Sequence, residues 1–142
     1  MSSSNPRRQL AGGLFALATS VGACVGACAA GPSRGDAEIR FVAVHNAFAG
    51  MGMAQTGPIQ RGSLAQGREV RLPVELASGC AMVVALGGDG VRDLDATLVD
   101  PSGAPLGHDT TRDPQAVVRV CVDQPGSYAL VVKMTEGAGE YL

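Results

Sequence analysis

The sequence lacks tryptophan and has few aromatic side chains of any kind, which make up 4% of its 142 residues. Aromatic side chains form the stacking surfaces on which many proteins bind sugars and nucleobases, so their scarcity counts against both ligand classes. Lysine is also nearly missing, with Lys133 as its single instance, and the arginines are scattered apart from Arg7 and Arg8. Because clustered basic residues attract phosphate backbones, we expect no nucleic-acid partner.

Residues suited to catalysis are scarce as well. The chain contains two histidines, His45 and His108, and no His-Glu-x-x-His pattern of the kind that holds a catalytic zinc. The segment 106–113, LGHDTTRD, gathers His108, Asp109, and threonines. Aspartate and threonine in such a connection between strands usually satisfy backbone donors. We therefore expect a protein that is not an enzyme.

Charge is missing altogether from residues 10–30, LAGGLFALATSVGACVGACAA. Arg7 and Arg8 precede this run, and small residues, a proline and charges follow it. A positive start, an apolar centre and a small-residue finish are typical of an export signal. A membrane-spanning helix is the alternative, but glycine, alanine, serine and threonine dilute the apolar content that such a helix needs. We expect a cleaved signal peptide over residues 1–29 and a short linker over residues 30–37.

Two cysteines near the end of this run, Cys24 and Cys28, each complete a Val-Gly-Ala-Cys motif. Each motif resembles the lipobox of bacterial lipoproteins, in which the cysteine is diacylated and becomes the new N-terminus. The resemblance implies a lipid anchor at Cys28 or at Cys24. Ordinary cleavage after Ala29 is the alternative, and it would release a secreted or periplasmic protein. A metal or redox pair is disfavoured, because no histidine or further cysteine lies nearby to complete a four-ligand site.

The other two cysteines, Cys80 and Cys121, follow the leader. Two cysteines in an exported domain most often form a disulfide, so we predict a bridge between the strands that carry them. Modification of Cys28 leaves this even pair, whereas modification of Cys24 leaves Cys28 as an odd thiol. A nucleophilic cysteine is the alternative, and it would need His45 or His108 as its base.

The remainder of the chain predicts strands, because its apolar residues alternate or form short β-branched runs between clusters of turn residues. The expected strands cover 39–45, 69–76, 80–87, 93–99, 116–122 and 127–134. Pro73 removes a backbone donor, which indicates an edge strand or a bulge. The segment 46–61 is expected as a surface loop or short helix, with Met51 and Met53 either filling a gap or forming an adaptable contact surface. Together these patterns predict an all-β sandwich over residues 38–142.

Three segments of this region carry a family resemblance: GSLAQG at 62–67, DLDATLVDPSG at 93–103 and PGSYALVV at 125–132. They are similar to motifs of the bacterial pre-peptidase C-terminal (PPC-like) domain. The resemblance implies an antiparallel, jelly-roll-like β-sandwich that serves as a non-catalytic targeting or binding module. The Cys80–Cys121 pair is not general in that family, and no enzyme domain accompanies the module here. We therefore expect an envelope protein that has adopted this fold.

Four aspartates form a candidate metal site after the glycine-rich turn, namely Asp89, Asp93, Asp95 and Asp100. Carboxylate oxygens are ligands that calcium prefers, so calcium is the one cofactor that we consider. The simpler interpretation is that Asp93 and Asp95 lie on the solvent face of a strand while Asp100 caps a turn. The simpler interpretation is favoured.

These observations predict a non-catalytic binding or accessory module of the bacterial cell envelope, exported and lipid-anchored, or else secreted or periplasmic. Its expected partners are an envelope protein or a surface polymer, together with the membrane that holds the anchor, and the contacts are expected in strand-connecting loops. One alternative is a structural subunit of an envelope assembly, with strand 69–76 pairing with a partner strand. Another is a calcium-dependent binding module.

Overall fold

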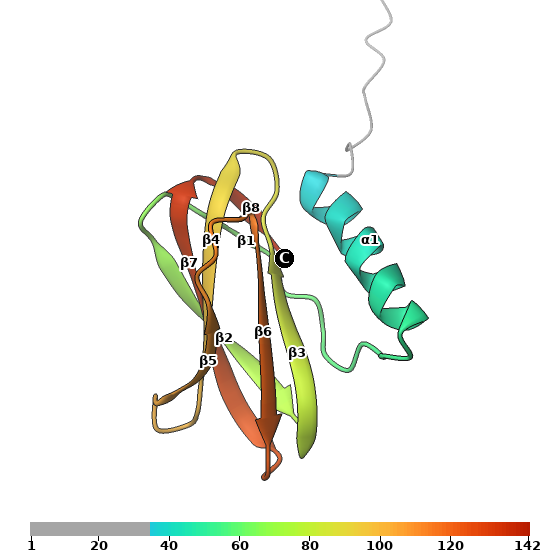
Figure 1. Ribbon diagram of the computed structural model, residues 1–142. Coiled ribbons are helices and arrows are strands. Elements are labelled where there is room, and N and C mark those ends of the chain that lie inside the picture. The colour runs from blue at the N-terminus through green and yellow to red at the C-terminus, as the bar shows by residue number, and fades with distance from the viewer. Residues whose placement is uncertain (1–34) are drawn as a thin grey trace, which may run out of the picture. The chain divides into compact units, whose positions relative to one another are not determined.

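The computed structural model describes residues 35–142, which form one helix and eight strands (Figure 1). The helix is α1 (Asp36–Gly50). The strands are β1 (Gly62–Leu64), β2 (Glu69–Leu76), β3 (Gly79–Leu86), β4 (Val91–Val99), β5 (Pro105–Asp109), β6 (Gln115–Val122), β7 (Gly126–Gly137) and β8 (Gly139–Tyr141). The predicted signal peptide, with Cys24 and Cys28, lies outside the described residues.

The strands form an all-β sandwich, as the sequence predicted. One sheet has four strands in the order β2-β7-β4-β5, and the facing sheet consists of β3 and β6. A short ribbon of β1 and β8 adjoins them, and every pairing is antiparallel. The placement of β2 at an edge agrees with the prediction from Pro73, because a proline there withholds a donor that no neighbouring strand requires.

The core lies between β4 and β7 on one side and β6 on the other. Its largest fully buried side chains are Leu94, Leu98, Val118, Val132 and Met134. Along β6 every second residue is buried, so the strand presents one apolar face to the core, as the alternation in the sequence predicts. Burial of large apolar side chains is the main stabilising contribution to such a sandwich.

The expected strand over 39–45 is wrong, because this segment belongs to α1. Its apolar run over residues 41–44 contains two β-branched valines, as in a strand, but Ala37, Phe41 and Val44 also fall on one side of a helix. Acidic residues in the first turn favour the helix dipole. At the other end Gly52 adopts φ of 80°, and the Met53 N–H donates to the Phe48 carbonyl, which closes the helix with a glycine cap.

The connection expected over 106–113 contains a strand that the sequence did not predict. Residues Pro105–Asp109 form β5 and pair with β4 at the edge of the four-stranded sheet. Its mostly exposed residues include glycine, histidine and aspartate, so no apolar alternation reveals it. Pairing with the long strand β4 supplies the hydrogen bonds that local preference does not favour.

Candidate functional site

A disulfide joins Cys80 on β3 to Cys121 on β6, which confirms the predicted bridge. The two residues are directly opposite each other, and both are exposed on the outer face of the two-stranded sheet. Their Cα atoms are 3.9 Å apart, the close spacing of a pair whose backbone groups are not hydrogen-bonded to each other. Because the two sulfurs are bonded to one another, neither cysteine is a free nucleophile.

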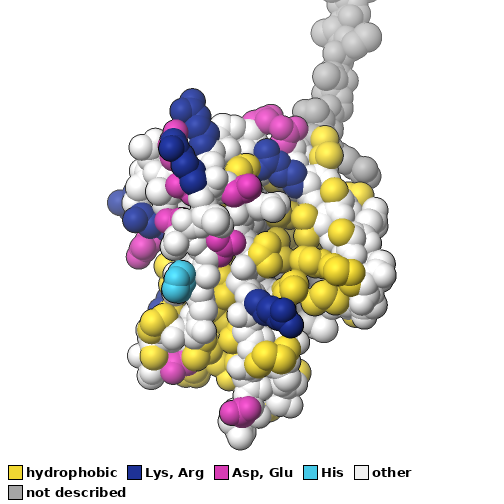
Figure 2. Space-filling view, viewed as in Figure 1, with side chains coloured by type: hydrophobic (Ala, Val, Ile, Leu, Met, Phe, Trp, Pro, Cys, Tyr) yellow, Lys and Arg dark blue, Asp and Glu magenta, His cyan; other side chains and the backbone are white. Residues whose placement is uncertain are grey.

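The outer face of the two-stranded sheet is apolar around this disulfide. Met82 and Val84 follow Cys80 at outward positions of β3, and Val117 is paired with Val84 on β6. Arg119 is the one charged residue in these two strands. Figure 2 shows hydrophobic side chains gathered between this sheet and α1. Met82, Val84 and Val117 are half-buried, and partly exposed apolar side chains that lie together mark interaction sites in many soluble proteins.

The outer face of the four-stranded sheet is charged by contrast. Lys133 on β7 is paired with Glu69 on one side and with Asp95 on the other, so opposite charges alternate across three strands. Arg71 and His108 are also exposed on this sheet. Such a charged face can remain in contact with water and does not require a further layer of helices or strands over it.

Helix α1 is attached to the sandwich near one end of β3. The Arg40 guanidinium donates to the carbonyl of Gly87 at 3.0 Å, and Ala37 is the buried residue of the helix. Other large apolar residues of the helix and its C-terminal cap remain exposed, with Ile39 at 58% and Met51 at 64% of their full accessibility. Met51 therefore does not fill a gap in the described fold. No helix in the described range 35–142 combines the length and apolar character needed to cross a membrane.

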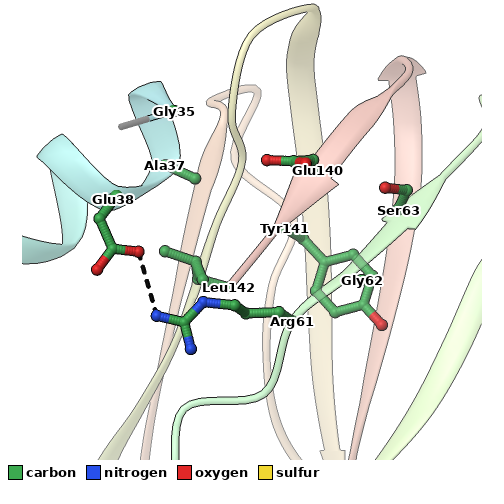
Figure 3. Close-up of a pocket in the computed structure, with 9 residues that line it drawn as sticks. All are labelled: Gly35, Ala37, Glu38, Arg61, Gly62, Ser63, Glu140, Tyr141 and Leu142. Carbon is green, nitrogen blue, oxygen red and sulfur yellow. Dashed lines mark hydrogen bonds and ion pairs between the residues drawn. The ribbon is translucent and has the colours of Figure 1, made fainter. Parts of the chain in front are cut away.

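A small hollow of about 240 Å³ lies between α1 and the β1–β8 ribbon (Figure 3). The Arg61 guanidinium lies 3.1 Å from the Glu38 carboxylate across the hollow, so these two opposite charges pair with each other. The Tyr141 ring packs so closely on Gly62 that a Cβ there would lie 2.3 Å from the tyrosine oxygen, and only glycine fits. The described residues that line the hollow include no histidine or cysteine, so Ser63 has no imidazole base within it.

The four aspartates proposed for calcium do not converge. Asp100 lies at the end of β4 opposite to Asp93, roughly 20 Å away at the rise of an extended strand. Its carboxylate accepts hydrogen bonds from Ser102 and from the Ala104 N–H, which lower its pKa and confirm the predicted turn cap. Over the described residues no group of three or more acidic, histidine or cysteine side chains is arranged to hold a metal ion.

Asp89 and Asp95 also have surroundings of their own. Asp89 is exposed and close to Asp36, whose hydrogen bond and charge raise the pKa of Asp89. Asp95 accepts a hydrogen bond from the Thr135 hydroxyl at 2.5 Å.

The prediction of a solvent-facing Asp93 is wrong, because this residue is 8% exposed. The pairing of β4 with β7 shifts register on both sides of Asp93, and such a bulge turns a side chain away from its regular direction. Its Oδ1 atom has no hydrogen-bond partner. Burial raises the pKa of Asp93, the nearby Asp95 charge adds to this increase, and Arg112 partly opposes it.

The polar segment 106–113 uses its side chains to satisfy backbone groups, as the sequence suggested. The Asp109 carboxylate accepts from the Val117 N–H at 2.8 Å and from the Thr111 N–H at 3.0 Å. Hydrogen bonds from Thr111 and Val117 lower the pKa of Asp109. Because Val117 lies on β6, Asp109 links the edges of the two sheets. His108 is exposed.

Sequence reasoning did not identify the apolar outer face of the two-stranded sheet. The signal was present, since the run from Cys80 to Leu86 has no charged residue, but an uncharged run is equally typical of a fully buried strand. No protein-family model matches the chain, and a search of curated proteins finds no match.

Proposed function

We propose that this chain is a non-catalytic binding module of the bacterial cell envelope, exported and anchored to a membrane by a lipid on Cys28 or Cys24. The observation that carries the proposal is the exposed Cys80–Cys121 disulfide on an apolar face. An accessible disulfide persists in oxidising compartments and is reduced in the cytosol. The uncharged run at residues 10–30 supplies the export signal that such a location requires.

A binding role is supported by the contrast between the two outer faces. The apolar face formed by Met82, Val84 and Val117 continues toward a helix with further exposed apolar residues. Apolar surface of this kind favours a protein partner over a hydrophilic surface polymer, because its burial is what would stabilise the complex.

A non-catalytic role is supported by the arrangement of the reactive side chains. His45 lies on α1 and His108 on β5, and both are exposed. The buried carboxylate of Asp93 has no nucleophile or imidazole among its hydrogen-bond partners in the described residues. General acid–base catalysis needs such groups within hydrogen-bonding reach of one another.

The test is the intact mass of native protein extracted with detergent, measured before and after reduction. We expect a mass that begins at Cys28 or Cys24 and includes acyl chains, with a gain of two hydrogens on reduction. A Cys28→Ser variant then distinguishes the two lipidation sites. A mass that begins at Ala30 without lipid would overturn the anchor, and a chain that keeps residues 1–29 would overturn export.

A further inference from the structure

The edge of β3 opposite to β6 presents backbone groups in a defined pattern. Because the Cys80–Cys121 pair is the closely spaced, non-hydrogen-bonded kind, the N–H and C=O groups of Cys80 point away from β6. The pattern repeats at every second residue of a strand, so the backbone groups of Met82, Val84 and Leu86 point away as well.

Leu142 confirms this orientation and occupies the first position on the edge. The Leu86 N–H donates to the Leu142 carbonyl and the Leu142 N–H donates to the Leu86 carbonyl, both at 2.9 Å. Within residues 35–142 no backbone group pairs with Cys80, Met82 or Val84 on that side. A row of unpaired donors and acceptors beside a paired residue is a template for another strand.

This edge has none of the features that usually prevent strands from pairing with each other. Residues 79–86 contain no charge and no proline. The corresponding edge of the other sheet, β2, carries Glu69, Arg71, Pro73 and Glu75. Charged residues and proline on an edge strand discourage pairing, so β2 is protected and β3 is not. Of these two edges, that of β3 is thus better suited to a partner strand than that of residues 69–76.

The core is incompletely covered beneath the same edge. Val70, Leu72 and Val74 point inward from β2 but are only half-buried, as are Ala81 and Val83 on β3. In the facing sheet β6 lies over β4 and β5, and β3 lies over β4, whereas β2 has no comparable facing strand. A strand added beside β3 would cover these apolar side chains, and their burial would stabilise the pairing.

Helix α1 runs beside β3 but cannot satisfy the edge, because its own backbone groups are hydrogen-bonded within the helix (Figure 1). Its side-chain hydrogen bonds to the sandwich, from Arg40 to the Gly87 carbonyl and from Arg61 to Glu38, lie toward its N-terminal end, and Gly87 is next to the residue already paired with Leu142. Phe41, Val44 and Phe48 farther along the helix are only half-buried. An added strand would therefore require the C-terminal part of the helix to move away from β3, whereas the contacts of Arg40 and Glu38 at its other end could remain.

We propose that the β3 edge accepts one extended segment of a partner protein, antiparallel to residues 80–85 and in line with Leu142. The inference rests on the proposed function as a binding module and specifies how the partner is bound. The segment has apolar side chains at inward positions, over Leu72 and Val83, and no charged side chain there, since an unpaired charge is costly to bury. A second copy of β3 fits poorly, because the edge strand β2 of each copy would then approach the other, and both carry charged residues and Pro73 that oppose pairing.

The test supplies the strand within the full chain by fusing the sequence Val-Thr-Val-Thr-Val-Thr after Leu142. In continued register the first valine is opposite Ala85 and faces inward, and the threonines face outward. We expect the unfolding midpoint to rise by roughly 5 °C and hydrogen exchange at the Met82 and Val84 amides to slow by roughly tenfold or more. The matched control Thr-Val-Thr-Val-Thr-Val has the same composition but turns its valines outward, and we expect little effect.

A Met82→Pro substitution in the fused chain provides the second test. It removes an N–H that faces away from β6, so the β3–β6 ladder is kept while the acceptor edge is blocked. We expect it to abolish the slowed exchange at Val84, whereas Arg71→Pro on the β2 edge leaves that protection in place.

Unchanged exchange at Met82 and Val84 in the Val-first fusion would overturn the acceptor. If the unfused chain is a dimer that Met82→Pro dissociates, the occupant is a second copy and the proposed partner segment is wrong. Neither result changes the lipidated mass, so failure of this inference is distinguishable from failure of the proposed envelope function.

Discussion

The two sheets of the sandwich share one core but differ in the faces and edges that they present to solvent. The four-stranded sheet has alternating charges on its outer face, with Lys133 between Glu69 and Asp95, and Pro73 on its edge strand. The two-stranded sheet has an apolar outer face with Arg119 as its charged residue, and no proline or charge on β3. The outer face and edge of the four-stranded sheet are suited to contact with water, whereas those of the two-stranded sheet are suited to contact with apolar groups.

The difference also shows how a small sheet is kept together. Two paired strands alone are marginally stable in water, and three or more strands or a covering element are usually needed. Here β3 and β6 are joined by the disulfide, by packing on the four-stranded sheet and by the Asp109 bond to Val117. The two-stranded sheet therefore depends on a few specific links that the larger sheet does not require.

Removal of the disulfide is expected to have the largest effect. The bridge spans a sequence separation of 41 residues, and closing a loop of this length stabilises by roughly 4 kcal/mol through the lost entropy of the unfolded chain. We expect the Cys80→Ala, Cys121→Ala double variant to lose about that much unfolding free energy in urea titration. Hydrogen exchange should accelerate more in β3 and β6 than in β2.

Reduction of the unaltered protein is the control for this prediction. It should reproduce the loss seen in the double variant and have no further effect on that variant. Equal acceleration of exchange in both sheets would contradict the special dependence of the two-stranded sheet on its covalent link.

Asp109→Ala tests the polar link between the sheets and is expected to have an intermediate effect. It leaves the Val117 and Thr111 N–H groups without their carboxylate acceptor, which should cost roughly 1–2 kcal/mol at pH 7. Because the pKa of Asp109 is lowered in the folded state, this stabilisation is present above its unfolded value and is lost as pH falls through the folded value. Denaturant unfolding at pH 7 and pH 3 measures both the loss of unfolding free energy and its dependence on pH.

The outcome at low pH distinguishes the carboxylate bond from simple packing of the side chain. We expect the difference between Asp109→Ala and the unaltered protein to shrink at pH 3. A difference that is independent of pH would show that ionisation of Asp109 does not contribute to the link.

Asp93→Asn is expected to have the smallest effect and the opposite sign. The raised pKa of Asp93 means that ionisation destabilises the folded state, and this cost appears as pH rises through the folded value. The neutral amide avoids it, so we expect a gain on the order of 1 kcal/mol at pH 7 that disappears at low pH. Thermal unfolding across that pH range measures it, with Asp123→Asn, at an exposed aspartate between β6 and β7, as the control. A loss of stability at pH 7 would contradict the prediction.

The strands were predictable wherever side-chain burial follows a local period. The alternation of residues 69–76 predicted β2 with its exact bounds, and Pro73 correctly indicated an edge. The candidate metal ligands were less predictable, because a bulge turned Asp93 inward and the length of β4 kept Asp100 far from it. Bulges and strand lengths depend on pairing with other strands, which no local pattern records.

The sequence by itself determined the all-β class, the inward faces of residues 69–76 and 94–98, and the pairing of Cys80 with Cys121. These follow from alternation with period two and from the presence of two cysteines, Cys80 and Cys121, after residue 30. Only the tertiary structure decided that residues 36–50 form a helix, that Asp93 is buried and that the edge of β3 is unpaired within the described chain. The physical reason is that hydrogen-bond pairing in sheets is non-local, so whether a strand has one neighbour or two depends on segments distant in the sequence.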